Sequence, residues 1–428
     1  MPKRGPSKAR RLRLCSPPVE SPRGLAPKLG SLLPRTHRMF ALAVAVAVAP
    51  FAIGFCAYVV YPAILWITTR VYSASSLPTE TAEWPSVTIT VPVYNAVSSI
   101  RNTLHLLMDL DYPRDRLQVL VLSDASTDGT DDVVRGFATR GVELVRATER
   151  RGKTAAENAA LSFARGEIIV NVDATVAVPR DSLKALLRAF ADPSVGVASG
   201  RDVSVDLEGE AGNRAEAGYV GYEMWLRGLE TRFGSIVGAS GCFFAIRRQI
   251  HSEALPPELS WDFASALVAR QKGYRTVSVP EARCLVPRAA SMETEFRRKA
   301  RTMARGLSTL FHFSELMNPL RYGSFAFSLI SHKLLRWLPY LLSPFSLAAL
   351  AILATQSAIA AFLLIALLTG VVCSVVVRDR RGIVSRPLAV AGFAVAALGA
   401  GLIAWYDAFR GESMVTWSPT QRPRASIF

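Results

Sequence analysis

The stretch that decides the fold is Leu117-Gln118-Val119-Leu120-Val121-Leu122-Ser123-Asp124-Ala125-Ser126-Thr127-Asp128-Gly129-Thr130. Its first half is a short apolar run, which predicts a buried strand over Leu117–Leu122. Asp128 and Gly129 then form a turn signal, and the amphipathic sequence beyond them predicts a helix over Thr130–Thr139. A strand that passes through a polar turn into a helix is the repeating unit of an α/β sheet.

The same alternation continues on both sides of this unit. It predicts strands over Ser86–Val91, Val142–Val145, Glu167–Val172 and Val195–Ser199, and helices over Ile100–Leu110, Thr154–Arg165 and Ser182–Phe190. Strands that alternate with helices indicate an α/β fold with a mostly parallel sheet covered on both faces. Ligands bind at the carboxyl ends of the strands in such sheets, so we look for chemistry directly after each strand.

Two of the predicted strands are followed at once by a polar segment with an aspartate, Asp124 in one case and Asp173 in the other. A single Asp after a strand is usually a turn former or a helix cap, which is our interpretation of Asp128. Two apolar strands that bring carboxylates to the same sheet edge favour a functional site. Lys153 begins a predicted helix, where backbone N–H groups also attract anions.

The sequence contains no GxxxxGKS phosphate loop and no GxGxxG after the first strand. A nucleotide diphosphate can still bind when carboxylates hold a divalent cation and the cation holds the diphosphate.

Several motifs then follow one another along the chain. They are Val87–Asn95 (VTITVPVYN), Ser123–Thr130 (SDASTDGT), Gly152-Lys153 with Asn158, Val172-Asp173-Ala174, Gly238–Gly241 with Arg247-Arg248, Trp261-Asp262-Phe263 and Arg297–Arg301. In this order they resemble the family 2 glycosyltransferases with the GT-A fold, over about Pro85 to Gly306. The flanking apolar segments are similar to those of the membrane-integrated members, the poly-N-acetylglucosamine, cellulose, hyaluronan and chitin-oligosaccharide synthases.

The resemblance implies a role for each matching residue. Contacts to the nucleotide-sugar are implied for Pro92, Tyr94, Asp124, Lys153, Asp173, Arg298 and Arg301. Within this set, Asp124 would meet the uracil and ribose. Asp173 matches the first Asp of the metal-binding DxD motif and would hold a divalent cation, Mg²⁺ or Mn²⁺. Asp262 would be the general base.

The chain departs from the family pattern at three places. Thr175 stands where the second Asp of DxD is usual, so one carboxylate ligand is missing. Trp261, and not an acid, precedes Asp262. The element that usually reads QxxRW is Arg298-Lys299-Ala300-Arg301-Thr302, without the Trp that stacks under the acceptor sugar, which argues against long processive synthesis.

Composition places the protein at a membrane. The chain has 428 residues with a formal net charge of +16, and half of its residues are hydrophobic. We predict a disordered basic arm or a mis-assigned start over 1–38, a transmembrane segment over 39–69, a GT-A domain over 84–290, amphipathic interfacial helices over 291–337, about three transmembrane helices over 338–406, and a tail over 407–428. The uncharged length of 39–69 is sufficient to cross a bilayer. The alternative for this segment is a re-entrant hairpin about Pro50.

The sequence therefore predicts an inverting transfer of a sugar, from UDP-GlcNAc or UDP-glucose, to a hydroxyl of a growing cell-surface polysaccharide. The alternatives are transfer of one sugar to a lipid-linked acceptor, or a catalytically inactive membrane partner subunit. The expected location is the bacterial inner membrane with the catalytic domain in the cytoplasm. Expected partners are the donor, the acceptor and membrane lipids, with an accessory subunit for export and no nucleic acid.

Overall fold

The computed structural model describes residues 35–71, 83–205, 211–251, 253–287, 292–376 and 386–411. The chain divides into two compact units, Met1–Leu42 and Ala43–Phe428. The described part of the first unit is the beginning of helix α1 (Arg35–Phe55). All the other described elements belong to the second unit. Most of the predicted arm over 1–38 and of the predicted tail over 407–428 lies outside the described residues.

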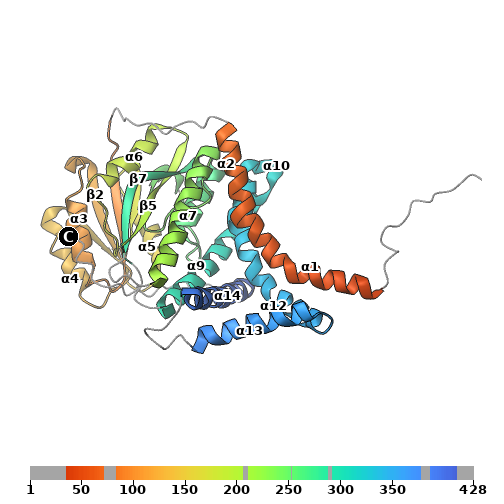
Figure 1. Cartoon of the computed structure of the whole chain (residues 1–428). Helices are drawn as coiled ribbons and strands as arrows, with labels where there is room; N and C mark the ends of the chain where they lie inside the picture. Colours follow the sequence, from red (N-terminus) through yellow and green to blue (C-terminus); the bar gives the residue numbers. More distant parts are fainter. Residues whose placement is uncertain are drawn as a thin grey trace, which may run out of the picture. The chain divides into compact units, whose positions relative to one another are not determined.

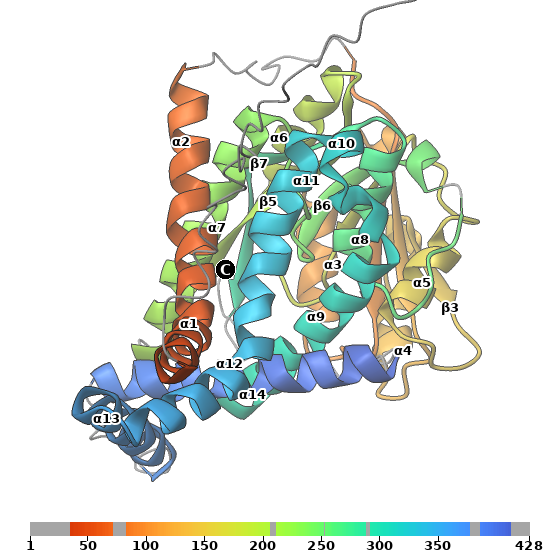
Figure 2. The ribbon, with the colours of Figure 1, turned by 90° about the vertical axis from the view of Figure 1, so that its right-hand side faces the viewer.

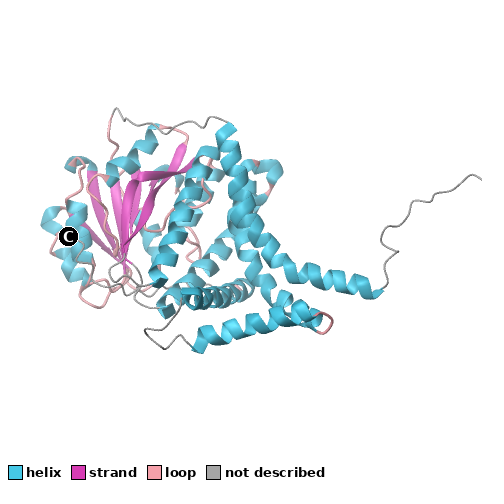
Figure 3. Cartoon of the chain, viewed as in Figure 1, coloured by secondary structure: helices cyan, strands magenta, loops and turns pink. Residues whose placement is uncertain are grey.

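A seven-stranded sheet forms the centre of the second unit, in the order β3-β2-β1-β4-β6-β5-β7 (Figures 1 and 3). The strands are β1 (Val87–Val93), β2 (Leu117–Ser123), β3 (Val142–Arg146), β4 (Ile168–Val172), β5 (Val195–Val205), β6 (Phe243–Arg247) and β7 (Arg275–Pro287). β6 is antiparallel to both of its neighbours, and the other pairs are parallel. The fold is therefore the predicted GT-A-like α/β fold with a mostly parallel, mixed sheet.

Helices cover both faces of this sheet. They are α3 (Ile100–Met108), α4 (Thr130–Arg135), α5 (Lys153–Ala160), α6 (Ser182–Arg188), α7 (Ala211–Phe233), α8 (Trp261–Gln271) and α9 (Met292–His312), with short 3-10 turns η2 (Arg114–Arg116), η3 (Ala138–Arg140), η4 (Ala189–Ala191), η5 (Arg248–Ile250) and η6 (Ser314–Met317). Every residue of β1 is buried. On one face Ile89 packs in the same cluster as Leu104 and Leu183, and on the other Ile169 packs with Phe244 and Leu267. Burial from both sides explains why the strands are apolar at consecutive positions.

The five predicted strands are confirmed, although β5 continues six residues beyond its predicted end, and all four predicted helices end earlier than predicted. α5 ends at Ala160 because the chain continues in a turn, with Phe163 N–H on the carbonyl of Ala160. The chain then enters β4 through Gly166, whose N–H donates to Thr88 Oγ1 at 2.9 Å. A Cβ at Gly166 would lie 2.4 Å from the backbone nitrogen of Thr88, so this close approach requires glycine.

Four further helical segments are rich in apolar residues. The first segment consists of α1, η1 (Cys56–Val60) and α2 (Tyr61–Val71). The second follows the short helix α10 (Pro319–Tyr322) and consists of α11 (Ser324–Leu329), η7 (Ile330–Leu334) and α12 (Leu335–Ala354). The third and fourth are α13 (Ala358–Val376) and α14 (Arg386–Arg410). Within the described ranges, two helices, His37–Val71 and Ser324–Ala354, are long and apolar enough to cross a membrane by length and composition alone. α1 runs through Pro50 as a helix, so the alternative of a hairpin at that residue is wrong.

Two of these helices, α2 and α14, pack against helices of the sheet domain (Figure 2). Tyr61 and Leu65 of α2 are buried against Leu226 and Leu229 of α7. α9 packs against α14 through a separate apolar cluster that includes Leu307 and Trp405. α9 lies in the range in which we predict amphipathic interfacial helices, 291–337, and part of its apolar face is covered by another helix of the chain.

Candidate active site

A cleft of about 480 Å³ opens at the carboxyl ends of β1 and β4. Its lining contains seven of the eight predicted site residues, namely Pro92, Tyr94, Lys153, Asp173, Asp262, Arg298 and Arg301. They come from the ends of β1 and β4 and from helices α5, α8 and α9. Residues far apart in the sequence thus share one cavity.

Asp124, the eighth residue, is almost completely buried, with 1% of its surface exposed, and is not part of the lining. Its two carboxylate oxygens accept the backbone N–H groups of Arg151 and Gly152 at 2.7 and 2.8 Å. Gly152 has a φ of 91°, a conformation that favours glycine. Asp124 therefore holds the loop that leads into Lys153.

The loop after β2 is fixed by a second aspartate. Asp128 accepts the backbone N–H groups of Val97 and Thr130 at 3.0 Å each, and it also accepts the Thr130 hydroxyl. This confirms the interpretation of Asp128 as a turn former. On the β1 side, the guanidinium of Arg150 lies 3.9 Å from the centre of the Tyr94 ring. A flat aromatic ring at the cleft is well suited to contact a planar base.

Lys153 and Asp173 form an ion pair in the cleft, with Nζ 2.6 Å from Oδ1. The same ammonium lies 3.3 Å from the carbonyl oxygen of Gly241 and 3.8 Å from Oε1 of Glu157. Burial disfavours the charged form of Lys153, but the negative charges of Asp173 and Glu157 outweigh it and raise the lysine pKa. Lys153 therefore stays cationic at the point where the two carboxylates converge.

Glu157 is a further acidic residue of the cleft, with 1% of its surface exposed. Burial raises the pKa of Glu157 to about 8; the Lys153 ammonium acts against this shift, and the charges of Asp173 and Asp262 add to it. Neither carboxyl oxygen of Glu157 has a hydrogen-bond partner within the described ranges. Sequence reasoning missed this residue; the signal was its i,i+4 spacing from Lys153, which puts both on one helix face.

Asp262 lies in the first turn of α8 and lines the cleft. Its Oδ1 accepts the Ser260 hydroxyl at 2.6 Å, and the carbonyl of Asp262 accepts the backbone N–H of Ala239. Gly241 lies against the carboxylate: a Cβ there would be 3.2 Å from Oδ2 of Asp262. The carboxylate is therefore held by a hydroxyl on one side and closely approached by a glycine on the other.

Helix α9 contributes a row of arginines. Arg298, Arg301 and Arg305 all line the cleft. Arg305 is buried and donates to Thr154 Oγ1 and to the carbonyl oxygen of Leu259, which ties α9 to α5 and to the segment before α8. Burial lowers the pKa values of Arg301 and Arg305, though guanidinium groups remain charged in proteins. Arg305, which sequence reasoning did not select, anchors the helix that presents the other two.

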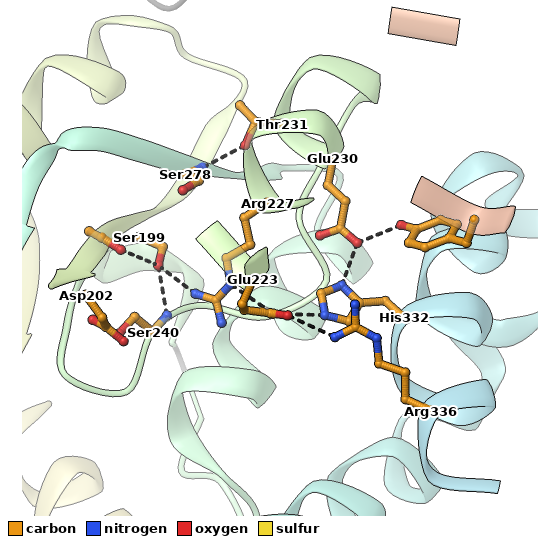
Figure 4. Close-up of polar contacts among 12 residues, drawn as sticks. Ser199, Asp202, Glu223, Arg227, Glu230, Thr231, Ser240, Ser278, His332 and Arg336 are labelled. Atoms are coloured by element: carbon orange, nitrogen blue, oxygen red, sulfur yellow. Dashed lines mark hydrogen bonds and ion pairs between the residues drawn. The ribbon is translucent and has the colours of Figure 1, made fainter. Parts of the chain in front are cut away.

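A further part of the lining comes from two helices, and we call it the helical lining: Tyr219, Glu223 and Arg227 of α7 with Lys333 and Trp337 of the Ser324–Ala354 helix. Behind it lies a buried polar network (Figure 4). His332 bridges two carboxylates, with Nδ1 2.6 Å from Glu230 and Nε2 2.9 Å from Glu223. Arg336 also pairs with Glu223 at 2.9 Å, and Glu230 accepts the hydroxyl of Tyr61 at 2.6 Å.

This network reaches from α2 to the sheet. Burial acts to raise the pKa of Glu223, but His332, Arg227 and Arg336 outweigh it and hold that pKa well below its usual range. Arg227 donates to Ser199 Oγ at 3.4 Å, and Ser199 Oγ accepts the N–H of Ser240 at 2.8 Å. Polar contacts therefore connect both candidate membrane helices with the loop that lies against Asp262.

Trp337 is the aromatic residue of the helical lining. Its ring lies edge-on to Phe263, with centroids 6.4 Å apart, and a Cβ on Gly306 would be 2.7 Å from it. One helical turn earlier, the Lys333 ammonium lies 5.1 Å from the Phe263 ring centre. Sequence reasoning placed this region among the amphipathic interfacial helices of 291–337, and nothing in its local pattern indicated that it reaches the cleft.

A divalent cation is the group that this type of site implies. Across the part of the chain that the structure describes, no three His, Cys, Asp or Glu side chains form a cluster able to hold a metal ion. Asp173 supplies one carboxylate to the cleft, and Thr175 lines it too. This set fits a cation of the Mg²⁺ type, which binds through one or two carboxylates together with substrate phosphates and water.

A GT-A-like sheet that gathers carboxylates, a lysine and arginines at its carboxyl edge is typical of the transferase class. The comparison with known families agrees with this class. Residues 88–255 match the model described as glycosyl transferase family 2. The match ends before Asp262 and the arginines of α9.

Individual relatives extend the similarity. The chain is 28% identical over 267 residues to an N-acetylglucosaminyltransferase of Mesorhizobium japonicum (57% of this chain, 61% of the relative). It is 27% identical over 225 residues to one of Rhizobium meliloti (48% and 52%). The chain thus spans little more than half the length of these curated relatives. Among solved structures, it is similar to the mannosyltransferase PcManGT of Pyrobaculum calidifontis, in complex with GDP-Man and Mn²⁺, with a TM-score of 0.66, 26% identity, and coverage of 88% of this chain and 100% of the other.

Proposed function

We propose that this protein is an inverting glycosyltransferase that moves a sugar from a nucleotide-diphospho-sugar to a hydroxyl of a saccharide acceptor at the membrane. One observation carries the proposal: a single cleft gathers Asp262, the Lys153–Asp173 pair and the α9 arginines. The names of the relatives favour UDP-GlcNAc as donor, with UDP-glucose as the second choice. In the leading version the acceptor is a growing cell-surface polysaccharide.

In this mechanism Asp262 is the general base. A sugar hydroxyl is a weak nucleophile, so its proton passes to the Asp262 carboxylate while its oxygen forms the new bond to the anomeric carbon. The bond from that carbon to the diphosphate oxygen breaks on the opposite face, which inverts the configuration. The hydrogen bond from Ser260 holds the base in one orientation.

The leaving nucleotide diphosphate gains negative charge as its bond breaks. Lys153, Arg298 and Arg301 line the cleft and would stabilise this charge. Asp173 would hold a Mg²⁺ or Mn²⁺ ion, which, when bound, neutralises the diphosphate as a Lewis acid. Pro92 and Tyr94 would flank the nucleoside. Asp124 would act on the nucleotide through the loop that it holds, at residues 151 and 152.

The apolar helices support a location in the membrane. We infer that the protein is integral to the bacterial inner membrane through His37–Val71 and Ser324–Ala354, with the catalytic domain in the cytoplasm, where nucleotide-sugars occur. Membrane lipids are then partners, and an export subunit is a further expected partner of a polysaccharide synthase.

A second candidate acceptor is a lipid-linked one that receives a single sugar. The observation that favours it is the position of Lys333 and Trp337, which lie in the cleft lining on a helix that is itself a candidate membrane span. A cation and an aromatic ring there would meet the phosphate and first sugar of an acceptor that arrives from the bilayer.

The test is release of nucleotide diphosphate by the full chain in detergent or nanodiscs. UDP-GlcNAc, UDP-glucose, UDP-galactose, UDP-GlcA and GDP-mannose are each supplied with Mg²⁺ or Mn²⁺, beside Asp262→Asn. We expect turnover with one donor and a loss of about 10²- to 10⁴-fold in the variant, which is the usual contribution of a general base. Undiminished turnover in Asp262→Asn would overturn the assignment of the base. A repeating product supports the polysaccharide acceptor, and one addition per acceptor supports the lipid-linked one.

A further inference from the structure

Lys153 has two carboxylate neighbours at different distances. It pairs with Asp173 at 2.6 Å, and Oε1 of Glu157 lies 3.8 Å from the same ammonium. Lys153 and Glu157 are four residues apart on α5, so they occupy the same helix face. All three side chains line the cleft.

The burial of the Glu157 carboxyl group is unfavourable in free energy. It is 1% exposed, and within the described ranges neither of its oxygens has a hydrogen-bond partner. Its immediate surroundings are charged, because it shares the cleft lining with Lys153, Asp173 and Asp262. A buried carboxyl that accepts or donates no hydrogen bond costs free energy. Such a group is explained if it gains its partner in another state of the site.

The state of the site with bound donor is the one in which Glu157 would gain a partner. Asp173 is the carboxylate that faces the diphosphate and its cation in the proposed function, yet Oδ1 of Asp173 is already paired with the Lys153 ammonium. Position 175 is a threonine, so the segment after β4 offers no second acid for this pairing. A divalent cation and an ammonium repel each other, so a cation on Asp173 favours a position of Lys153 farther from that carboxylate.

We propose that Glu157 is a second ion-pair partner of Lys153: when the cation and the nucleotide diphosphate bind at Asp173, the Lys153 ammonium moves to the Glu157 carboxylate. This inference rests on the proposed function. The movement is small, because the two atoms lie 3.8 Å apart and a close ion pair needs about 2.8 Å. Glu157 is then a positioning residue that acts through Lys153, and it replaces the missing second acid in charge but not as a ligand.

The experiment measures Mn²⁺ binding and not turnover. The free Mn²⁺ signal in electron paramagnetic resonance is titrated with full-chain protein in detergent, in the presence of UDP and, separately, of GDP. The proteins are the wild type, Glu157→Leu, Lys153→Met and the double variant. Glu143→Gln is the matched control, because Glu143 lies outside the cleft and pairs with Arg165 at the surface.

We expect Glu157→Leu to weaken Mn²⁺ binding about tenfold, as loss of a residue that supports a metal ligand commonly does. Lys153→Met removes the competing ammonium, so Glu157→Leu should change Mn²⁺ affinity less than about twofold in that background if Glu157 acts through the lysine. Glu143→Gln should bind like the wild type. Thermal unfolding of each variant checks that the fold is retained.

Three outcomes contradict the inference in different ways. Equal Mn²⁺ affinity in the wild type and Glu157→Leu overturns the role of Glu157 and leaves the proposed function standing. An equal loss of Mn²⁺ affinity in both backgrounds overturns the role of Glu157 as second ion-pair partner of Lys153 and makes Glu157 a direct ligand. Absence of Mn²⁺ binding to the wild type with either nucleotide removes the cation from the proposed function, and the inference fails with it.

Discussion

Two sets of residues in the cleft lining come from different parts of the fold and differ in how their charged groups are paired. The sheet-side set follows the strands of one sheet edge, and includes Tyr94, Lys153 and Asp173. The helical lining comes from α7 and from the Ser324–Ala354 helix, and its acid Glu223 belongs to a buried network of charges. The first set presents groups to the cleft, whereas the second pairs its groups with one another.

This difference separates what each set can do. A group that faces the cleft can exchange its partner for substrate, as the Lys153–Asp173 pair would. A group that is buried in a network fixes the position of the helices that carry it, because each charge depends on its neighbours for solvation. Substitutions on the sheet side should therefore change turnover, and substitutions in the network should change stability.

Glu223→Ala should give the largest loss of stability. Glu223 pairs with His332, Arg227 and Arg336, and the alanine leaves these groups buried without their shared carboxylate. Breaking a buried ion pair costs about 3–5 kcal/mol, so thermal unfolding in detergent should shift down markedly. Glu149→Ala, at an exposed ion pair with Arg151, is the control and should leave the unfolding midpoint nearly unchanged. A midpoint for Glu223→Ala equal to that of the wild type would show that the network does not hold the helices.

The next effect compares two aspartates that follow the strands on either side of β1, Asp124 after β2 and Asp173 after β4. Asp173→Asn should lower turnover by about 10²- to 10³-fold, because it weakens charge stabilisation at the diphosphate, and should change stability by less than about 1 kcal/mol. Asp124→Asn replaces an acceptor of two backbone N–H groups, so it should lower stability by about 1.5–3 kcal/mol. Nucleotide-diphosphate release and thermal unfolding are measured for both variants. The reverse pattern, with Asp173→Asn the less stable, would contradict the division between the two roles.

These two residues also show how far the sequence could lead. Apolar strands with a polar end are local patterns, so β1 to β5 and the carboxylates of the sheet edge could be predicted. The pattern did not distinguish Asp124 from Asp173, because the difference lies in the loop at residues 151 and 152, whose N–H groups turn back onto Asp124. β6 and β7 were not predicted, since they come after a long helical region and pair with strands distant in sequence.

The helical lining could not be predicted at all. Lys333 and Trp337 have the sequence of a membrane-interface anchor, and they reach the cleft because Gly306 of α9 leaves room for the indole ring. Glu157 was not predicted as a site residue for a related reason, because a glutamate in a helix is usually exposed to solvent. Burial of a charged side chain is decided by tertiary packing, which local sequence does not specify.

Trp337→Ala tests the helical lining with a smaller effect. If the indole contacts the acceptor, its loss should lower acceptor-stimulated release of nucleotide diphosphate about tenfold, the scale of one aromatic contact. Release with water as acceptor should stay unchanged, because the donor groups lie on the sheet side. Trp225→Ala is the matched control, since Trp225 of α7 is exposed and lies outside the cleft lining. Equal losses of both releases would place Trp337 in donor binding or in folding.

The smallest effect is a pH dependence at Glu157. Its pKa is raised to about 8 in the folded protein, while an ordinary glutamate titrates near 4.5. The folded state therefore retains a proton that the unfolded state has lost between these values, so the contribution of Glu157 to stability is present at low pH and declines as the pH rises through this window. Glu157→Gln cannot titrate. Its unfolding free energy relative to the wild type should rise with pH between about 5 and 8, by at most about 1.4 kcal/mol per pH unit. Thermal unfolding of both proteins across this range, without nucleotide or metal, measures the difference. A difference independent of pH would mean that the carboxyl is already ionised beside Lys153, and the two carboxylates would then share one ammonium before the donor arrives.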